Sequence, residues 1–408
     1  MDGTEAIGEL ELRLARYPSE RYPVQHATVQ FHFGVALTNA GRLAEAEQAL
    51  AMAARLFDPD RLPTEHAKAI NAYGVVHRLR GRPGAAAEAF RRAAEAFGAA
   101  RLPLEQGAAL FNLGLVQREL GDADGAVASF ELARERLDPR SVPAEAAAAA
   151  RELGATLLGT GRLDDAVDVL EAAVALARRT GDLAGLGAAA NVLGLTWLAE
   201  GHMAEAVEAF HTAVAAHPRT LRPGEFAMAK GNLAVAYERA GDQARARLAA
   251  IQAAGTPAAA EPVLAQATGV LERVGRQPGA LLEVLDREPS DGWAVAVREE
   301  LARWLDADAA ERRAEAGAWI DGLLARPAVG PGLSEIWLGA LLELPSEAME
   351  ELIRSTLEAL AERDEARTAR FRSEVSRVMA RFHVPQWQRL ADSFNRAAVK
   401  LRQESSWG

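Results

Sequence analysis

The sequence contains no cysteine in 408 residues. It therefore has no disulfide framework and no thiol chemistry. Aromatic residues make up only 6% of the chain, whereas alanine is abundant throughout. Small side chains suit helices that pack at short distances, and this composition argues against a fold built on β-sheets.

Signals for export or membrane insertion are also missing from the sequence. The first five residues, Met1-Asp2-Gly3-Thr4-Glu5, are acidic and contain no apolar signal core. No apolar run approaches the length of a membrane span. The formal net charge of −11 disfavours nucleic-acid binding by the chain as a whole, although a local basic patch stays compatible with it. We expect a cytoplasmic protein that binds neither membranes nor nucleic acid.

No catalytic, cofactor or metal site is predicted. The eight histidines are scattered, and no pair has the spacing of a zinc-binding helix. His211 and His217, six residues apart, are expected on the exposed surface near a helix end. No glycine-rich phosphate-binding loop is found. Many of the glycines instead recur at a regular spacing along the chain.

A 40-residue repeat runs between residues 31 and 254. Each copy contains a large apolar residue followed by glycine, or by alanine in the last copy. The six pairs are Phe33-Gly34, Tyr73-Gly74, Leu113-Gly114, Leu153-Gly154, Leu193-Gly194 and Leu233-Ala234. A second glycine follows seven residues after each pair, at Gly41, Gly81, Gly121, Gly161, Gly201 and Gly241.

Each repeat predicts two antiparallel helices, which we call A and B. In residues 64–97, apolar side chains recur at helical spacings of three and four, first around Ile70 and then around Phe90. Gly81 lies where helix A must end, because glycine tolerates the left-handed conformation of a helix terminus. A pair this thin cannot bury its own apolar face. It must stack on the next pair, which gives a solenoid.

The pattern resembles the tetratricopeptide repeat (TPR). The fifth copy shows it as Leu193, Gly194, Trp197, Gly201, Ala206, Phe210, Ala213 and Pro218. The period of 40 exceeds the usual 34, and the early Trp of the motif is missing. Five prolines recur with the same spacing, at Pro23, Pro63, Pro103, Pro143 and Pro223. Because proline suits the first turn of a helix, helix A is expected to start there and to be long. Such long repeats resemble the kinesin-light-chain branch of the family, most closely at residues 231–237.

The resemblance implies an all-α, right-handed TPR solenoid. We expect an N-terminal capping helix in residues 1–22 and six TPR helix pairs in 23–254. A degenerate repeat or capping pair is expected in 255–289, followed by a helical C-terminal domain without repeats in 290–408. The fifth repeat has Gly181-Asp182-Leu183 in place of the proline, so its first turn should differ. Residues 404–408 are expected to form a disordered tail.

The resemblance also implies a binding groove along the concave face, lined by helix A residues just before the Leu-Gly pair. The residues at these positions are Phe31, His32, Asn71, Phe111, Asn112, Arg151, Glu152, Asn191 and Asn232, and all of them except Glu152 are candidate binding residues. An Asn amide both donates and accepts hydrogen bonds, so it can bind the backbone of an extended peptide of any sequence. The resemblance to kinesin light chains, whose Asn residues hold peptides, favours this interpretation. The alternative is that each Asn bonds the neighbouring repeat and only supports stacking.

Four basic residues could give the first half of the groove a positive floor. They are Lys68, Arg78, Arg118 and Arg151. Such a floor would favour an acidic peptide or a C-terminal carboxylate. The alternative is a solvated face whose basic side chains pair with nearby glutamates. The carboxylate clamp of chaperone-binding TPR proteins is not reproduced.

We expect a non-enzymatic scaffold or adaptor that binds a peptide or partner protein, with Phe31 and Phe111 as apolar anchors. One alternative is a regulator, in which a bound peptide or small ligand couples the solenoid to the C-terminal region. Another is an enzyme or biosynthetic component with its site in 290–408. The sequence leaves open the identity of the partner and whether the chain forms a homo-oligomer.

Overall fold

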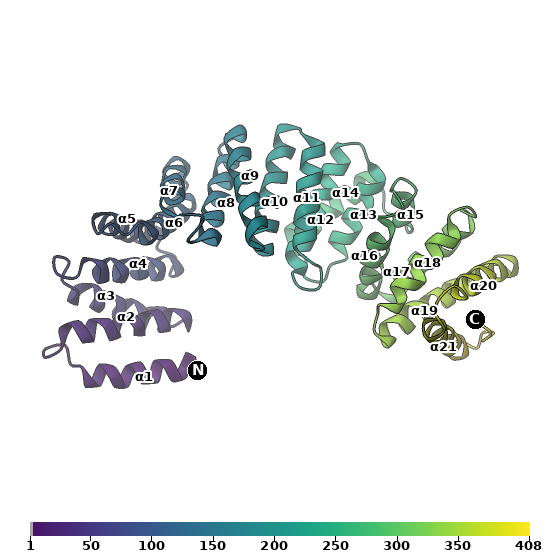
Figure 1. The fold of residues 1–408 in the computed structure, drawn as a ribbon, viewed down its shortest axis with the longest axis horizontal. Coiled ribbons are helices and arrows are strands. Elements are labelled where there is room, and N and C mark those ends of the chain that lie inside the picture. Colours follow the sequence, from purple (N-terminus) through teal and green to yellow (C-terminus); the bar gives the residue numbers. More distant parts are fainter. Residues whose placement is uncertain (1–2) are drawn as a thin grey trace. The chain divides into compact units, whose positions relative to one another are not determined.

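A computed structural model describes residues 3–408, with side chains from Ile7 onward, as twenty-one α-helices. No strand is found in this part of the chain. The helices follow one another as stacked pairs (Figure 1), which confirms the predicted all-α solenoid. Contacts divide the chain into two compact units between His202 and Met203. The two units are described separately.

The first unit consists of one leading helix, four complete A–B pairs and the helix A of the fifth repeat. Its helices are α1 (Gly3–Arg16), α2 (Pro23–Asn39), α3 (Leu43–Leu56), α4 (Pro63–Leu79), α5 (Pro83–Ala99), α6 (Pro103–Glu119), α7 (Ala123–Arg136), α8 (Pro143–Gly159), α9 (Leu163–Thr180) and α10 (Leu183–Glu200). Helix α1 packs on α2, and Ile7 is buried in a cluster with Leu37 and Leu50.

Local signals place the helix boundaries where the sequence predicted them. The repeat prolines are the first residues of α2, α4, α6 and α8. The glycines after each helix A have left-handed backbones, as at Gly81 with φ of 70°. Helix α10 begins differently, as expected, because the Asp182 side chain caps it by accepting the Gly185 N–H at 2.9 Å.

Close contact between helices A and B depends on the first glycine of each repeat. In the four complete pairs, a large side chain sixteen residues later fills the space where a Cβ would lie. The contacts are Gly34–Leu50, Gly74–Phe90, Gly114–Phe130 and Gly154–Leu170. A Cβ at Gly154 would lie 2.4 Å from Cγ of Leu170, which is fully buried. Only glycine lets the two helices approach this closely.

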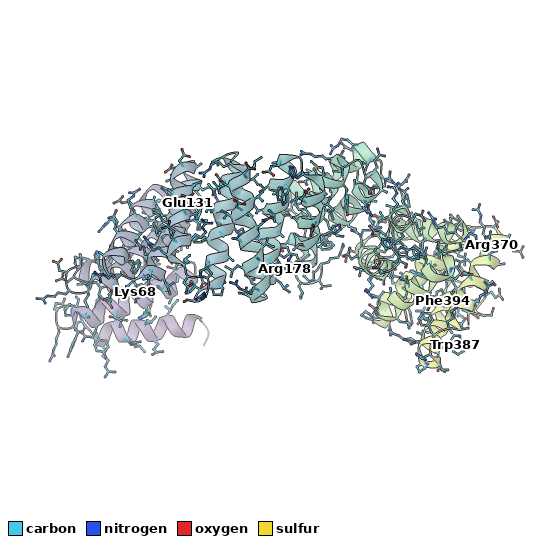
Figure 2. The ribbon with its side chains drawn as sticks, turned by 45° about the horizontal axis from the view of Figure 1, so that its top comes forward. Lys68, Glu131, Arg178, Arg370, Trp387 and Phe394 are labelled. Carbon is cyan, nitrogen blue, oxygen red and sulfur yellow. The ribbon has the colours of Figure 1, made fainter. Side chains whose placement is uncertain are left out.

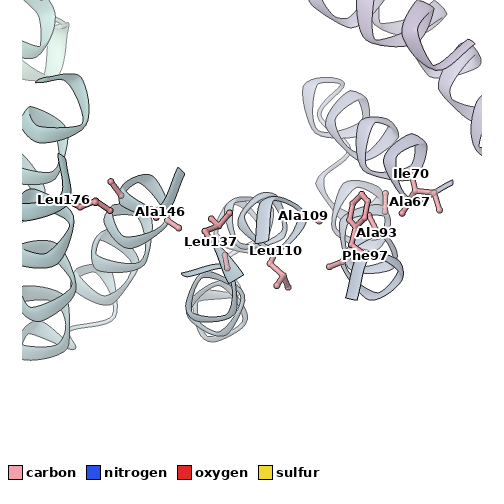
Figure 3. Close-up of a cluster of buried hydrophobic side chains, with 14 residues drawn as sticks. Ala67, Ile70, Ala93, Phe97, Ala109, Leu110, Leu137, Ala146 and Leu176 are labelled. Atoms are coloured by element: carbon pink, nitrogen blue, oxygen red, sulfur yellow. The ribbon is translucent and has the colours of Figure 1, made fainter. Parts of the chain in front are cut away.

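The core of the first unit runs through several repeats rather than within one. Figure 3 shows a single buried cluster that continues from α4 to α9, with Phe97, Leu110, Leu137 and Leu176 among its members. Successive A helices also contact one another, whereas successive B helices make no comparable contacts. Each pair therefore completes its core only by stacking on its neighbours.

Helix α10 corrects one expectation from the sequence. Its eighteen residues have a mean hydropathy of 1.2, so by length and composition alone it could span a membrane. Half of the helix is buried inside the structure, and it carries the repeat pair Leu193-Gly194. Burial and the repeat pair are typical of a core helix in a repeat array. Length and hydropathy alone are weak evidence that α10 spans a membrane.

The second unit continues the series of helices. They are α11 (Met203–Ala216), α12 (Pro223–Arg239), α13 (Gln243–Ala254), α14 (Glu261–Val274), α15 (Ala280–Leu285), α16 (Trp293–Asp306), α17 (Ala309–Leu324), α18 (Gly330–Leu342), α19 (Ser346–Ala361), α20 (Glu365–Met379) and α21 (Val384–Lys400). Helix α15, in the degenerate pair, has only six residues and contacts both α13 and α16. The domain boundaries expected at 254 and 289 stay predictions.

The C-terminal helices are regular in space although their sequences do not repeat. Helices α16, α18 and α20 pack side by side in one layer, and α17, α19 and α21 pack in another. Four large aromatic side chains form the centre, namely Trp319, Trp337, Phe371 and Phe394, with neighbouring ring centroids 6.2–6.5 Å apart. This region is therefore a two-layer helical stack with its own core.

Residues 404–408 are ordered, contrary to expectation. Trp407 is only 3% exposed and stacks on Phe394 of α21 at 4.8 Å (Figure 2 labels Phe394). The Arg372 guanidinium lies over the Trp407 ring, 4.8 Å from its centroid. Asn395 accepts the Trp407 backbone N–H at 2.9 Å and donates to its carbonyl at 3.2 Å. The prediction of disorder was wrong because a tail rich in small polar residues ends in one buried aromatic anchor.

The glycine contact can be tested within a single helix. We expect Gly154→Ala to lower the free energy of unfolding by about 1–3 kcal/mol, because the new methyl group overlaps Leu170. Gly159→Ala in the same helix is the matched control, since a Cβ there meets no atom within 4 Å. The control should change stability by at most about 1 kcal/mol, in the stabilising direction. Urea denaturation followed by circular dichroism measures both, and equal midpoints would contradict the packing role.

Candidate partner-binding face of the helical repeats

A stripe of half-buried residues crosses the A helices of the first unit. Directly after the glycine of each repeat lies an apolar side chain that is neither fully buried nor fully exposed. These residues are Val35, Val75, Leu115, Ala155 and Leu195. Residues three and four positions earlier lie on the same side of each helix. These five residues, together with the helix A residues three and four positions before each of them, form one surface. We call it the A-helix face.

The predicted aromatic anchors lie on the A-helix face but belong partly to the core. Phe31 and Phe111 are half-buried, and each packs against a buried cluster. The ring of Phe111 meets Phe130 edge to face at 5.8 Å. His32 is exposed beside Phe31, with ring centroids 5.3 Å apart. Part of each Phe surface therefore stays available to a ligand.

The four predicted Asn residues have different environments. Asn112 is half-buried and has no hydrogen-bond partner in the described part of the chain. Asn71 is also half-buried, and its Oδ1 atom lacks a partner there. Asn191 and Asn232 are only 5% and 8% exposed, and Asn232 accepts a hydrogen bond from Gln266 at 3.0 Å. Asn71 and Asn112 are thus the amides with unused capacity, whereas Asn232 supports packing within its own unit.

Three of the four predicted basic residues are paired with carboxylates. Arg78 of α4 donates to Glu119 of α6 at 2.7 Å, which links two neighbouring A helices. Arg118 of α6 contacts Glu152 of α8 at 2.7 Å, and Arg151 contacts the same carboxylate at 2.6 Å. Because Arg118 and Arg151 share one carboxylate, these pairs offset two of the four positive charges expected on the groove floor.

Lys68 is the fourth predicted basic residue, and it is exposed on α4 (Figure 2). Two of the four positive charges expected on the groove floor are therefore offset, and Lys68 is the one predicted cation with no carboxylate beside it among the ion pairs of the described residues. The physical basis for a preference for acidic peptides is reduced accordingly.

Sequence reasoning missed the apolar ladder of this face, and it left open whether the basic residues pair with nearby glutamates. The apolar ladder follows the glycine of every repeat, so its signal was present in the alignment of the copies. The acidic partners Glu119 and Glu152 carried no such signal, because they occupy different positions within their repeats. Which cation each one meets depends on the rotation of one helix against the next.

The C-terminal region contains a charged cluster around a buried arginine. Arg303, only 1% exposed, contacts Glu300 at 2.6 Å and both Glu311 and Glu315 at 2.8 Å. Burial raises the pKa of Glu315, and the nearby Glu300 charge adds to the rise. These groups satisfy one another, and the geometry is that of a structural network. No metal-binding group of three His, Cys, Asp or Glu side chains is found in residues 3–408.

The expectation that His211 and His217 lie on exposed surface was wrong for His217. This side chain is only 2% exposed, and burial lowers its pKa. His211 is hydrogen-bonded to Tyr237 in the second unit.

Comparisons with known proteins agree with this geometry. A tetratricopeptide repeat family model matches residues 108–139, which contain most of α6 and all of α7. The same residue pattern recurs five more times at a spacing of 40. Residues 108–139 thus match a tetratricopeptide repeat, and the five other copies of the pattern support an array of such repeats. Such arrays are scaffolds for protein–protein interaction, and the family is generally non-catalytic. Comparison of the sequence with curated proteins found no match.

Several solved structures have a similar fold. The apo form of RapI is 11% identical and covers 67% of this chain and 93% of its own, with a TM-score of 0.48. PilF from Pseudomonas aeruginosa is 16% identical, with coverages of 60% and 97% and a TM-score of 0.46. The TPR-like repeats of a putative kinesin light chain from Podosopora anserina are 20% identical, with coverages of 53% and 99% and a TM-score of 0.39. At these identities only the fold is shared.

His77 gives the repeat array a pH dependence. It is 7% exposed on α4, meets Tyr73 at 4.2 Å, and its Nδ1 has no partner in the described structure. Burial lowers the pKa of His77, and the Arg82 charge lowers it further, while Glu47 opposes this. The neutral imidazole therefore contributes stability that is present above the unfolded pKa of about 6.5 and is lost as pH falls through the folded pKa.

We expect His77→Gln to reduce the loss of stability between pH 7.5 and pH 5.5. Gln is the residue at the same position of the next repeat, Gln117, so the substitution suits the site. The measurement is the urea midpoint at both pH values. His32→Gln, at an exposed position, is the control. A pH dependence equal to that of the wild type would remove His77 as its source.

Proposed function

We propose that the A-helix face of the first unit binds an extended segment of a partner protein. The observation that carries this proposal is a ladder of half-exposed apolar side chains running beside an unpaired amide, Asn112. A repeat array can offer the same small set of contacts at regular intervals along such a segment. This makes the protein an adaptor rather than an enzyme.

Backbone hydrogen bonds would hold the segment. The Asn112 amide can donate to a carbonyl and accept from an N–H of the ligand. The Oδ1 of Asn71 would gain a donor that the protein itself does not supply, since it has no partner in the described structure. Because these contacts involve the ligand's main chain, they are independent of its sequence.

Apolar side chains of the segment would supply most of the affinity. Val75 and Leu115 present partly exposed surface on neighbouring helices, and Phe31 and Phe111 flank them. Burial of such surface stabilises a complex by about 25 cal/mol per Å² before the costs of association are subtracted. Since Arg78, Arg118 and Arg151 are already paired, the partner segment need not be acidic.

Two further expectations from the sequence stay predictions. These are the kinesin-light-chain-like mode of peptide binding and the cytoplasmic location. The kinesin-light-chain-like binding mode also uses Asn residues, as the present proposal does. The present proposal depends on Asn71 and Asn112 in particular.

The proposal can be tested with a photo-reactive probe followed by affinity measurements. Benzoyl-phenylalanine placed at Leu115 should cross-link a partner in lysate of the source cell. The same probe at Glu131, on helix α7 (Figure 2), is the control. With the cross-linked segment as a synthetic peptide, Asn71→Ala/Asn112→Ala should weaken binding about 5- to 150-fold, which is the loss of one to three hydrogen bonds of about 1 kcal/mol each.

The matched control for the double variant is Gln48→Ala, which removes an exposed amide from helix α3. It should leave the affinity unchanged. Circular dichroism should show that the double variant and the control are both folded. Equal affinity of the two would then contradict the proposed role of the Asn residues. Cross-linking at Glu131 but not at Leu115 would move the binding surface to the B helices.

A further inference from the structure

The second unit contains a cavity of about 380 Å³ that has no part in the proposed function. Its walls come from α11, α12 and α13 of the repeats and from α15 and α16 of the region that follows. Val295, which is 54% exposed, marks its rim on α16. The volume falls within the range of small-molecule binding sites.

Apolar side chains form most of the cavity wall. Val214, Leu233, Leu248 and Val284 line it, and each is otherwise buried. They come from four different helices, so the cavity is enclosed from several sides. Such a lining favours the apolar body of a ligand.

One uncharged hydrogen-bonding pair lies in this wall. The Nε2 atom of His211 lies 2.6 Å from the Tyr237 hydroxyl. Burial raises the pKa of Tyr237 to about 12. His211 is exposed as a residue, but the protein atoms packed around its ring lower its pKa, and the Lys230 charge adds to this effect. Both groups are therefore neutral near pH 7. Whichever of them donates the shared proton, the phenol oxygen can form one more hydrogen bond.

The charged groups around the cavity are already balanced. Lys230 contacts Glu299 at 2.8 Å, and its side chain is only 9% exposed. Arg245 contacts Glu288 at 2.7 Å and Asp242 at 2.8 Å. A ligand with a net charge would have to break one of these pairs and leave its other member without a partner, which is costly for partly buried groups. The cavity therefore selects against ions.

We propose that this cavity binds a small, uncharged and mostly apolar organic molecule that forms one hydrogen bond with Tyr237. The ligand would contact repeat helices on one side and α15–α16 on the other. It would thus stabilise the packing of the C-terminal stack on the last repeat. The proposal is independent of partner binding at the A-helix face, so either can fail alone.

The first test is a fluorescence titration of the full chain with 1-N-phenylnaphthylamine, which is neutral and apolar. We expect saturable binding at one site per chain. The anionic analogue 1-anilinonaphthalene-8-sulfonate has a similar aromatic body with a charged group, and it should bind at least tenfold more weakly. Absence of saturable binding of the neutral probe, or equal affinity of both probes, would overturn the proposal.

The second test fills the cavity from opposite walls. Ala215→Phe extends from α11, where the residue is exposed, and Ala296→Phe extends from α16, where it is half-buried. Each should weaken binding of the neutral probe at least tenfold. Val384→Phe, at a 71% exposed position on α21, is the matched control and should bind like the wild type. Unchanged affinity in a folded cavity variant would show that the probe binds elsewhere.

A third measurement needs only the wild-type chain. Saturating 1-N-phenylnaphthylamine should slow amide hydrogen exchange in residues 280–300 and in α12 and α13, and leave α18–α21 unchanged. Protection confined to other helices, or no protection at all, would overturn the proposal even if both Phe variants failed to fold.

Discussion

The close contact between a glycine of helix A and a large residue of helix B is the constraint on which this structure depends. It draws the two helices of a pair together, and the pair is then too thin to bury its own apolar surface. Leu50, Phe90, Phe130 and Leu170 fill the contact in successive repeats, and each is at most 1% exposed. The pairs stack because the remaining apolar surface can be buried only against the next pair. The A-helix face is the part of this surface that stacking leaves half covered.

Features of the fold that depend on local chemistry could be predicted from the sequence. Proline at the first turn and glycine at the left-handed end act within a few residues, so α2, α4, α6 and α8 begin where Pro23, Pro63, Pro103 and Pro143 indicate. The layers of α16–α21 could not be predicted, because no repeated local signal marks them. The buried position of Trp407 depends on Arg372 and Asn395, which are far from it in the sequence.

The candidate site also has features that local sequence predicts and features that depend on contacts between helices. The repeat pattern predicts that Phe31, Asn71, Phe111 and Asn112 lie on one side of the A helices, since helical periodicity decides which residues share a face. It could not predict that Arg78 meets Glu119, because that contact depends on how two neighbouring helices are rotated. Charge on a helical-repeat surface is therefore a property of the stack. An array rich in arginine can therefore present less positive charge than its sequence suggests.

The cavity lies where the repeat pattern weakens. In the sixth copy Ala234 replaces the glycine and Ala250 the large residue, and both are fully buried. The helices that follow, α14 and α15, no longer keep the 40-residue period. Regular stacking therefore cannot fill the space beside α13, and the void is lined instead by Leu233, Leu248 and Tyr237. The cavity opens to solvent beside Val295, and its charged groups are already paired. A small uncharged ligand that covers this apolar lining would therefore add stability that the sequence itself does not supply.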